Sequence, residues 1–334
     1  MNEFLKKKAA VTSILAISIG LAAIFATVLT AEVQSSGFGN TGAVYTIDNS
    51  ASGNNVILYS RAPDGTLSSI GTFPTGGLGT GTALASQSAI VLTQDSRWLL
   101  AVDAGSNEIS VFRVGHVSLT LVSKTSAQGI LPISLTVFKD WVYVLDSGGL
   151  GNIAGFQLNN DGSLTYVSGS TQPLSGMSNP SPEQIGFSPA GNLIIVTEKG
   201  TNIIDTYTVG HNGVASAPTT HTSAGAGPYG FAFTDANHLI VSEAASNTLS
   251  SYVVSNTGDL RTMSGAIPTF GNAPCWVVVT GNGQFAYTTN AHGGTISTFS
   301  ISRTGGLTLF SSIASSTLIP ALDMAFSAHG QFLY

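Results

Sequence analysis

The chain has 334 residues, of which only 8% are charged, and its formal net charge is −6. A charged share of about 25% is usual for soluble domains, so glycine, serine and threonine supply most of the polar character here. The sequence has no basic stripe, which excludes the electrostatic footprint of a nucleic-acid-binding protein.

The first 34 residues differ in kind from the rest. Lys6, Lys7 and Lys8 precede an uncharged, largely apolar run over residues 9–31. That pattern is typical of a secretory signal or of a membrane anchor. The run is long enough to span a bilayer, and a cut after Ala31 would leave Leu29 where a small residue is preferred, so a retained anchor is favoured. We expect 1–34 to be a signal sequence or anchor with an apolar helix, and 35–42 to be a linker. Both alternatives place the following domain outside the cytoplasm.

Strand patterns follow from residue 43 onward. The first unit shows apolar segments at 44–47, 56–59 and 67–73, with a turn at Pro63-Asp64-Gly65. Five fuller units follow at 78–129, 130–176, 177–225, 226–271 and 272–318. Asn and Gly mark the expected outer hairpins, as in Asn160-Asp161-Gly162, because they tolerate the positive φ of tight turns. No stretch after Ala43 shows a convincing helical period.

Two columns of residues recur through these units. A polar residue ends the second strand of each unit, and an aromatic residue follows nine to eleven positions later. The polar column is Asp48, Asp103, Asp146, Glu198, Glu243 and Asn290. The aromatic column is Tyr59, Phe112, Phe156, Tyr207, Tyr252 and Phe299. A repeat of this length, built from strands and turns, predicts an all-β chain folded as a β-propeller.

The C-terminus ends inside a repeat. Residues 320–334 have the pattern of a first strand, a turn and the start of a second strand, and the first unit lacks an innermost strand of its own. We therefore expect a propeller of the seven-bladed type over 43–334 that is truncated in its seventh blade. The corresponding hypothesis is that the sequence is a fragment, and coding sequence beyond Tyr334 without a further repeat would contradict it.

The units resemble those of the lactonase-type seven-bladed propellers, which include 6-phosphogluconolactonase-like and carboxymuconate-cyclase-like proteins. The resemblance rests on Phe187-Ser188-Pro189-Ala190-Gly191-Asn192, on Asp161-Gly162-Ser163-Leu164-Thr165 and on the segment 326–334. A second resemblance, to surface-layer propellers, shows in Ala286-Tyr287-Thr288-Thr289-Asn290.

The resemblance implies a catalytic set of histidines, an arginine and a glutamate, which does not transfer to this chain. The positions after the corresponding prolines hold neither histidine nor arginine; they are Ile133-Ser134, Glu183-Gln184, Tyr229-Gly230 and Cys275-Trp276. Glu198 belongs to the polar column, and Lys199 stands where the family glutamate is expected.

A site is still expected where the polar column and the residues after the prolines meet. In an antiparallel pair the end of the second strand lies beside the start of the first, so both sets are predicted to edge one mouth of the central tunnel. Crowded carboxylates there would raise one another's pKa and supply a general acid or base. The catalytic candidates are Glu198 and Glu243. The ligand-binding candidates are Asp103, Asp146, Glu183, Gln184, Lys199, Tyr229, Cys275, Trp276 and Asn290.

The structural alternative for the polar column is that each residue only accepts hydrogen bonds from the turn that follows it. Cys275 is the single cysteine, so no intrachain disulfide forms, and nothing in the sequence pairs it with a base. The six histidines lack metal-ligand spacing, and no metal or other cofactor is predicted.

Two functions stay open. The first is an extracytoplasmic binding module, secreted or anchored and monomeric, whose tunnel mouth takes a lactone, a sugar or a surface protein. It needs no nucleic acid, and it reaches a membrane only through an uncleaved N-terminal segment. The second is a lactone hydrolase or lactonising, muconate-cyclase-like enzyme using tunnel-mouth carboxylates. The missing histidine and arginine favour the first.

Overall fold

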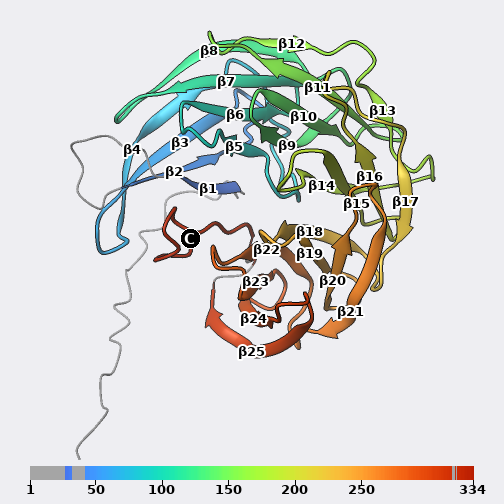
Figure 1. Ribbon diagram of the computed structural model, residues 1–334. Coiled ribbons are helices and arrows are strands. Elements are labelled where there is room, and N and C mark those ends of the chain that lie inside the picture. Colours follow the sequence, from blue (N-terminus) through green and yellow to red (C-terminus); the bar gives the residue numbers. More distant parts are fainter. Residues whose placement is uncertain (1–26, 32–41, 318–319, 321) are drawn as a thin grey trace, which may run out of the picture.

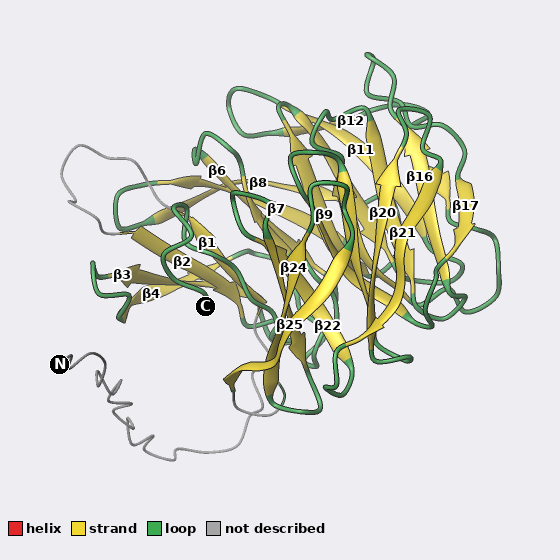
Figure 2. Ribbon diagram, turned by 60° about the horizontal axis from the view of Figure 1, so that its bottom comes forward, coloured by secondary structure: helices red, strands yellow, loops and turns green. Residues whose placement is uncertain are grey.

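The computed structural model describes residues 27–31, 42–317, 320 and 322–334, and these form strands and loops without a helix (Figures 1 and 2). The predicted all-β class is confirmed. The strands form six antiparallel sheets, here called blades 1 to 6, in which strands adjacent in sequence pair with each other, except that the short β13 pairs with β11. This simple meander explains why short strands and tight turns dominate the sequence.

The bounds of the strands follow the predicted repeats. Blade 1 consists of β1 (Thr27–Ala31), β2 (Gly42–Ile47), β3 (Asn55–Arg61) and β4 (Leu67–Pro74). Blade 2 consists of β5 (Ile90–Leu92), β6 (Trp98–Asp103), β7 (Glu108–Val114) and β8 (Leu119–Ser126). Blade 3 consists of β9 (Pro132–Phe138), β10 (Trp141–Asp146), β11 (Asn152–Leu158), β12 (Leu164–Tyr166) and β13 (Gln172–Pro173).

The remaining blades repeat the pattern. Blade 4 consists of β14 (Pro182–Phe187), β15 (Leu193–Glu198), β16 (Ile203–Thr208) and β17 (Thr219–Thr222). Blade 5 consists of β18 (Pro228–Phe233), β19 (His238–Glu243), β20 (Thr248–Val254) and β21 (Leu260–Pro268). Blade 6 consists of β22 (Pro274–Val279), β23 (Phe285–Asn290), β24 (Thr295–Ile301) and β25 (Leu307–Ser316).

The blades are arranged around a common axis (Figure 1). The first strand of each blade lies innermost, and these strands contact one another in the order β1, β5, β9, β14, β18 and β22. We call the segment that joins the last strand of one blade to the first strand of the next an interblade link. This arrangement is a propeller, as predicted.

The aromatic column forms the packing between neighbouring blades. Phe112, Phe156, Tyr207, Tyr252 and Phe299 are at most 2% exposed, whereas Tyr59 of blade 1 is half-buried. Phe112 of blade 2, for example, shares a hydrophobic cluster with Leu58 of blade 1. Burial of rings of this size is a large part of what holds the blades together.

The C-terminal residues lie between blades 6 and 1. Residues 325–334 form a short hairpin in which the backbone groups of Ala325 and Tyr334 exchange hydrogen bonds of 3.0 Å. The Tyr334 hydroxyl donates to the Gly65 carbonyl of blade 1 at 2.8 Å. On the other side, the rings of Phe326 and Tyr287 of blade 6 are 5.5 Å apart. The hairpin thus occupies the position of a seventh blade, in agreement with the pattern of its sequence.

Five residues of the expected N-terminal signal or anchor behave differently from the expectation. Residues Thr27–Ala31 form β1, which pairs with β2 as the innermost strand of blade 1. The rest of the expected apolar helix, and most of the linker, lie outside the described residues. Within the described part of the chain there is no helix with the length and apolar character needed to cross a membrane.

Candidate functional site

The first strand of each blade begins at the same face of the ring where the second strand ends. The register shows this in blades 3 to 6, where a proline at the start of the first strand pairs with the polar-column residue; the pairs are Pro132 with Asp146, Pro182 with Glu198, Pro228 with Glu243 and Pro274 with Asn290. We call this side of the ring the Lys199 face. It contains both sets of residues that the sequence singled out.

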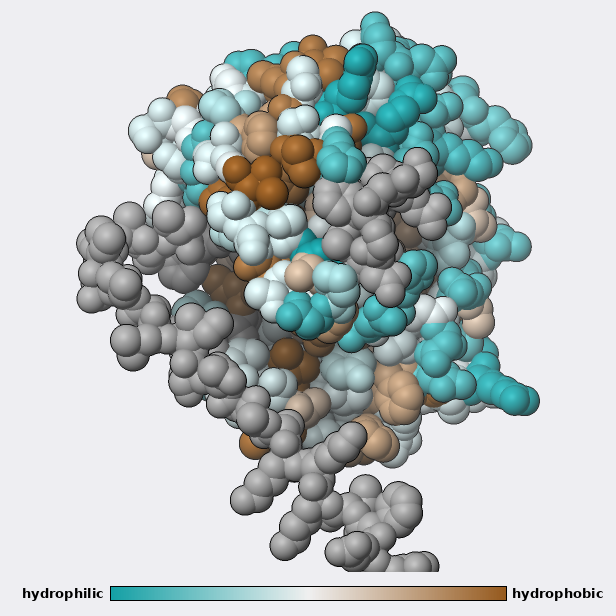
Figure 3. All heavy atoms as spheres, turned by 90° about the vertical axis from the view of Figure 1, so that its left-hand side faces the viewer, coloured by the Kyte–Doolittle hydropathy of each residue, from teal (hydrophilic) through white to brown (hydrophobic). Residues whose placement is uncertain are grey.

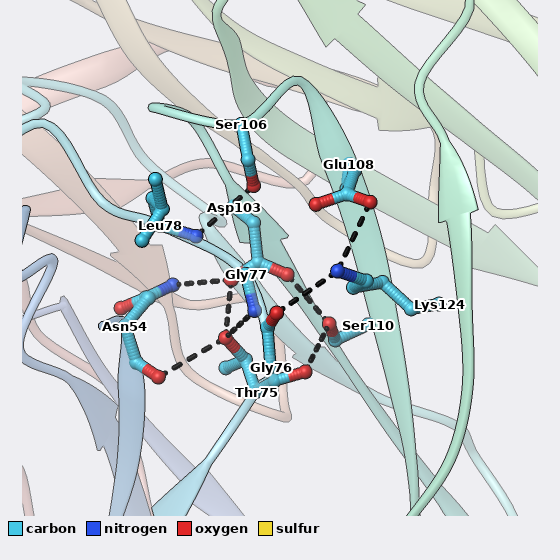
Figure 4. Close-up of polar contacts among 10 residues, drawn as sticks. All are labelled: Asn54, Thr75, Gly76, Gly77, Leu78, Asp103, Ser106, Glu108, Ser110 and Lys124. Carbon is cyan, nitrogen blue, oxygen red and sulfur yellow. Dashed lines mark hydrogen bonds and ion pairs between the residues drawn. The ribbon is translucent and has the colours of Figure 1, made fainter. Parts of the chain in front are cut away.

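Asp103, at the end of β6, joins blade 2 to blade 1 (Figure 4). Its carboxylate accepts hydrogen bonds from Asn54 Nδ2 at 2.8 Å and from Thr75 Oγ1 at 2.5 Å, both in blade 1 or its link. It also accepts one from Ser110 Oγ of β7 at 2.5 Å. Gly77 leaves room for it, since a Cβ there would lie 2.4 Å from Asp103 Cγ. Burial raises the pKa of Asp103, and the three hydrogen bonds oppose that shift.

Glu243 repeats this arrangement between blades 4 and 5. Its carboxylate accepts hydrogen bonds from the Gly225 amide at 2.7 Å and from Ser223 Oγ at 3.0 Å, both in the preceding link. Within its own blade, Thr248 Oγ1 and Ser250 Oγ donate to it at 2.5 and 2.6 Å. The side chain is completely buried. Both oxygens are therefore occupied by donors of the fold.

Glu198 has the same role between blades 3 and 4. Ser175, in the preceding link, donates to it through its amide and its hydroxyl, each at 2.8 Å, and Thr201 Oγ1 donates at 2.5 Å. In blade 6, Asn290 Nδ2 donates to Thr295 Oγ1 and Ser297 Oγ at 2.9 and 2.8 Å. The polar-column residues at these junctions thus form hydrogen bonds that hold each blade to its own turn or to the preceding link, and we call these residues staples.

Asp146 and Asp48 deviate from this pattern. Asp146 accepts one hydrogen bond, from Asn152 Nδ2 at 3.0 Å, and burial raises its pKa to about 8. Asp48 in blade 1 is only half-buried and accepts hydrogen bonds from Ser50 and Asn55 of its own turn. It thus follows the local-turn alternative.

The structure does not bring the polar column and the residues after the prolines together in one carboxylate-lined mouth, contrary to the expectation. Glu198 and Glu243, the catalytic candidates, are fully buried at blade junctions and are saturated by donors of the protein. Asp103 and Asn290 also lie at blade junctions. The physical reason is that a side chain at the end of the second strand meets the link of the preceding blade before it can reach the axis.

Asp205 is a buried carboxyl that the sequence reading missed. It lies in β16 at the position that Ser110, Ser250 and Ser297 occupy in other blades, seven residues after the polar column. Neither of its oxygens has a hydrogen-bond donor among the described residues. Burial, together with the neighbouring Glu198, raises its pKa to about 9. The signal was present in the sequence as an acid in a column of serines.

At the axis, Glu183 of blade 4 and Lys199 form an ion pair. The Glu183 side chain is 3% exposed, whereas that of Lys199 is 35% exposed. The Lys199 ammonium lies 5.2 Å from the centre of the Tyr229 ring, a distance typical of cation–π contacts. Burial raises the pKa of Glu183 to about 7, although Lys199 opposes this shift. The pair is thus a polar feature of the axial region that reaches solvent through Lys199.

Trp276 and Cys275, at the start of β22, complete this axial cluster. The Trp276 ring lies 5.5 Å from that of Tyr229. Its indole N–H is buried and has no acceptor among the described residues. Cys275 donates to the Ala273 carbonyl, and burial raises the pKa of its thiol to about 12. Cys275 therefore stays protonated and is unsuited to nucleophilic attack.

The axis itself is crossed by the interblade link before β5. Within it, the Ala85 carbonyl accepts a hydrogen bond from the Tyr229 hydroxyl at 2.5 Å, and Ser86 Oγ donates to the Ile133 carbonyl at 2.7 Å. The Gln87 amide group makes a pair of hydrogen bonds with the backbone of Val277, at 2.9 and 3.1 Å. The segment thereby connects blade 2 to blades 3, 5 and 6.

Gln184 makes an equivalent pair of hydrogen bonds across one blade boundary. Its side-chain amide bonds the carbonyl and amide of Phe231 at 3.1 and 2.6 Å. Gln184 thus positions β18 against β14, and it is not available to a ligand. Gln87 was missed from the sequence because its partner lies 190 residues away.

Three grooves open on the opposite face and do not contain the axial cluster. The first, of about 240 Å³, lies between blades 1 and 2 and includes Leu58, Ile70 and Val117. The second, of about 340 Å³, lies between blades 2 and 3 and includes Arg97, Trp98 and Lys139. Another, of about 310 Å³, lies at the equivalent place between blades 5 and 6. Because the grooves recur with the repeat, we attribute them to blade geometry. Among the described residues no group of three His, Cys, Asp or Glu side chains is arranged to hold a metal ion.

Comparison with known proteins supports the propeller. A family model described as "Lactonase, 7-bladed beta-propeller" matches residues 40–148 and 133–334. A solved structure of a putative 6-phosphogluconolactonase from Bacteroides fragilis is 16% identical with a TM-score of 0.68, over 87% of this chain and 84% of that one. A periplasmic gluconolactonase from Pseudomonas aeruginosa is 16% identical with a TM-score of 0.67, over 83% of this chain and 84% of that one.

A more distant likeness is to a virginiamycin B lyase from Staphylococcus aureus, at 13% identity and a TM-score of 0.56, over 90% of this chain and 93% of that one. None of the curated proteins matches this chain. At these sequence identities the solved structures indicate the fold alone. The chemistry of the site follows from the residues that this chain places there.

Proposed function

Because this chain belongs to the lactonase family of seven-bladed β-propellers, we propose that it is an extracytoplasmic binding module which holds a small polar ligand at the axial pair of Lys199 and Glu183. The observation that carries this proposal is the contrast in hydrogen bonding. The polar-column glutamates are saturated by the fold, whereas Lys199 is partly exposed and the indole N–H of Trp276 is unpaired among the described residues.

The chemistry of the cluster favours a ligand with an acceptor group. An ammonium and an indole N–H are both donors, so a carboxylate, a phosphate or a lactone carbonyl would satisfy them. The Tyr229 and Trp276 rings add apolar area beside these donors, which suits the carbon skeleton of a sugar. A sugar acid or a sugar lactone combines these features, and the names of two similar structures include such compounds.

The extracytoplasmic location rests on the sequence of the N-terminal segment. Three lysines followed by an uncharged run, of which residues 9–26 precede β1, are expected to direct the chain into the membrane with the propeller outside. Proteolysis of intact cells that removes the propeller while a cytoplasmic marker survives would support this location. Resistance of the propeller in intact cells, with digestion after lysis, would contradict it.

Calorimetric titration of the full chain with gluconate and 6-phosphogluconate tests the binding role. We expect saturable binding of at least one of them and a loss of about tenfold or more in affinity for Lys199→Met, since charge-assisted hydrogen bonds contribute strongly to anion recognition. Lys139→Met, which removes a lysine from the opposite face, is the matched control and leaves the affinity unchanged. Equal losses for both variants, or no binding of either probe, would overturn the proposal.

A second candidate function is lactone hydrolysis, which one observation favours. The Glu183 pKa of about 7 suits a general base, and Lys199 lies beside it. In this mechanism Glu183 takes a proton from a water molecule while the oxygen of that water adds to the lactone carbonyl carbon. Lys199 stabilises the resulting oxyanion. The ring C–O bond then breaks and the ring oxygen receives the proton. Acid release from gluconolactone that disappears in a folded Glu183→Gln variant would establish this function instead.

A further inference from the structure

The two faces of the ring differ sharply in charge. The Lys199 face is built from the turns between second and third strands and from the interblade links. Within the described residues, the turns and the links between blades 1 to 6 contain two charged side chains, Asp48 and Lys199, and the segment after β25 adds the buried Asp323. Asp48 is satisfied by its own turn, and Lys199 is paired with Glu183. One further ion pair, between Glu108 and Lys124, lies at the rim (Figure 4).

The turns of the opposite face contain nine charged residues. They are Asp64, Asp95, Arg97, Lys139, Asp140, Asp161, Asp235, Asp259 and Arg303. Figure 3 shows one side of the molecule, where hydrophilic residues gather toward the right-hand part and pale or hydrophobic residues predominate among the coloured atoms to their left. A soluble protein normally distributes charge over its whole surface, so the Lys199 face needs an explanation.

Large apolar side chains stand exposed on the tips of the same segments. Leu78, Ile130, Met177 and Phe270 occupy four of the interblade links and are 43, 63, 53 and 79% exposed. Leu150, in the turn after β10, is 58% exposed. Single exposed apolar residues are ordinary. Here five such residues lie on separate loops of one nearly uncharged face. Exposure of that much apolar surface to water is unfavourable.

The chain outside the described residues attaches at this face. In the register of blade 1, Thr27 of β1 pairs with Ile47, the last residue of β2 and the neighbour of Asp48. The chain therefore enters β1 from the Lys199 face. The uncharged run over residues 9–26 comes immediately before that point in the sequence.

We infer that the Lys199 face lies on a lipid bilayer, with the five apolar tips inserted into its interface. Insertion of the apolar side chains removes their surface from water, which is favourable. The main cost of contact with a bilayer is the desolvation of charged groups, and this face has almost no unpaired charge. A bilayer is also the phase for which residues 9–26 are suited. This inference does not depend on which ligand Lys199 holds, and it would place that ligand at the level of the lipid headgroups.

Quenching by bromine atoms on lipid acyl chains tests the inference with the full chain in phosphatidylcholine vesicles. Phe270→Trp places a reporter on a tip, and Val117→Trp places a matched reporter at a 48% exposed position in a turn of the opposite face. The three native tryptophans give the background of the unsubstituted chain. We expect the added fluorescence of Phe270→Trp to be quenched at least twofold and that of Val117→Trp to be unaffected.

The comparison separates docking from simple tethering. A chain held only by its N-terminal segment would expose both reporters to bromine equally, and equal quenching or no quenching of either overturns the inference. Ile130→Trp repeats the test on another blade in case the first variant folds poorly. A spectral shift of the tip reporters with protein concentration, without quenching, would show that the face binds a second copy instead. Gluconate binding measured on the same samples reports on the proposed function separately.

The described residues of the Lys199 face contain no cluster of lysines and arginines, and this adds a second expected result. Anionic lipids attract proteins through surface lysines and arginines, at about 1 kcal/mol for each residue. Because Lys199 is already paired, we expect quenching of Phe270→Trp to change by less than about twofold when a third of the lipid is phosphatidylserine, in a chain whose Lys6, Lys7 and Lys8 are also replaced by glutamine. A large increase would mean that electrostatic attraction to the headgroups, and not insertion of the apolar tips, brings the chain to the vesicle.

Discussion

Glu198 and Lys199 are adjacent in the sequence, and they illustrate two different uses of the end of a propeller strand. Glu198 is completely buried at the junction of blades 3 and 4, where Ser175 and Thr201 saturate it. Lys199, one residue later, lies toward the axis, is partly exposed and pairs with Glu183 of the first strand. The difference teaches that a polar residue ending a strand is structural when the preceding link reaches it, and is available for binding when it points past that link.

The largest expected effect concerns a staple. Glu243→Ala removes the shared acceptor of four donors, of which those of Ser223, Thr248 and Ser250 are buried, and each donor left unsatisfied costs about 1–3 kcal/mol. We expect the free energy of unfolding in urea to fall by about 3 kcal/mol or more. Asp48→Ala is the matched control, because Asp48 is half-buried and serves only its own turn. Equal losses of unfolding free energy in the two variants would contradict the distinction between a residue at a blade junction and one that serves only its own turn.

Asp205 provides a test of opposite sign. Its folded pKa of about 9 lies above the ordinary value of 3.8, so the folded chain keeps a proton that the unfolded chain has released. The free energy of unfolding contributed by this group is therefore present below about pH 4 and is lost as pH rises toward 9, by up to about 1.4 kcal/mol per pH unit.

Replacement by the residue that other blades use should remove this penalty. We expect Asp205→Ser to stabilise the protein at pH 8 and to flatten the dependence of unfolding free energy on pH between 5 and 9. Part of the slope remains, because Asp146 and Glu183 also have raised pKa values. Asp161→Ser, at an exposed turn, is the control and leaves the slope unchanged. A slope that persists in full in Asp205→Ser contradicts the assignment.

The axial pair predicts a pH dependence of binding. Below a pH of about 7 the Glu183 carboxyl is protonated and the Lys199 charge is uncompensated; above it the two charges cancel. We expect gluconate affinity to fall as pH rises above 7, by up to about tenfold per pH unit. Calorimetric titration between pH 6 and pH 8 measures this. Glu183→Gln should give a flat profile, and a wild-type profile that is already flat would refute the coupling.

The smallest expected effect is that of Lys199→Met on stability. At pH 6 the protonated Glu183 needs no counterion, so the free energy of unfolding should stay within about 0.5 kcal/mol of wild type. At pH 8 the variant leaves a buried carboxylate without its partner, and a modest loss should emerge. Thermal unfolding at the two pH values checks this. A large loss at pH 6 would show that Lys199 is a structural residue like Glu198.

The fold could be read from the sequence because each repeat has its own apolar strands, turn residues and columns. The aromatic column was informative since one ring per blade, such as Phe299, must fill the space to its neighbour. The place of the polar column along the strand followed from the same spacing. The direction in which these side chains point could not be predicted from the spacing. Glu243 contacts Ser223 and not the axis because of the path of the interblade link, and the sequence of that link carries no periodic signal.

The axial cluster corresponds to only part of the set that the sequence placed at one mouth. Glu183, Tyr229, Cys275 and Trp276 follow repeated prolines and lie close together. Asp103, Glu198, Glu243 and Asn290 were expected beside them and lie at blade junctions instead. That the link at residues 84–88 crosses the axis could not be foreseen, since its contacts with Tyr229 and Val277 are long-range. Asp205 could have been found by aligning the third strands of the repeats.

Calorimetric titration of gluconate into Glu198→Gln and Glu183→Gln, at pH 6 and pH 8, tests the central claim most directly. The account predicts that Glu198→Gln is less stable and binds with the affinity and pH dependence of wild type, whereas Glu183→Gln loses the pH dependence. A folded Glu198→Gln protein that no longer binds, beside a Glu183→Gln protein that binds as wild type does, would show that the site lies in the polar column and not at the axial pair.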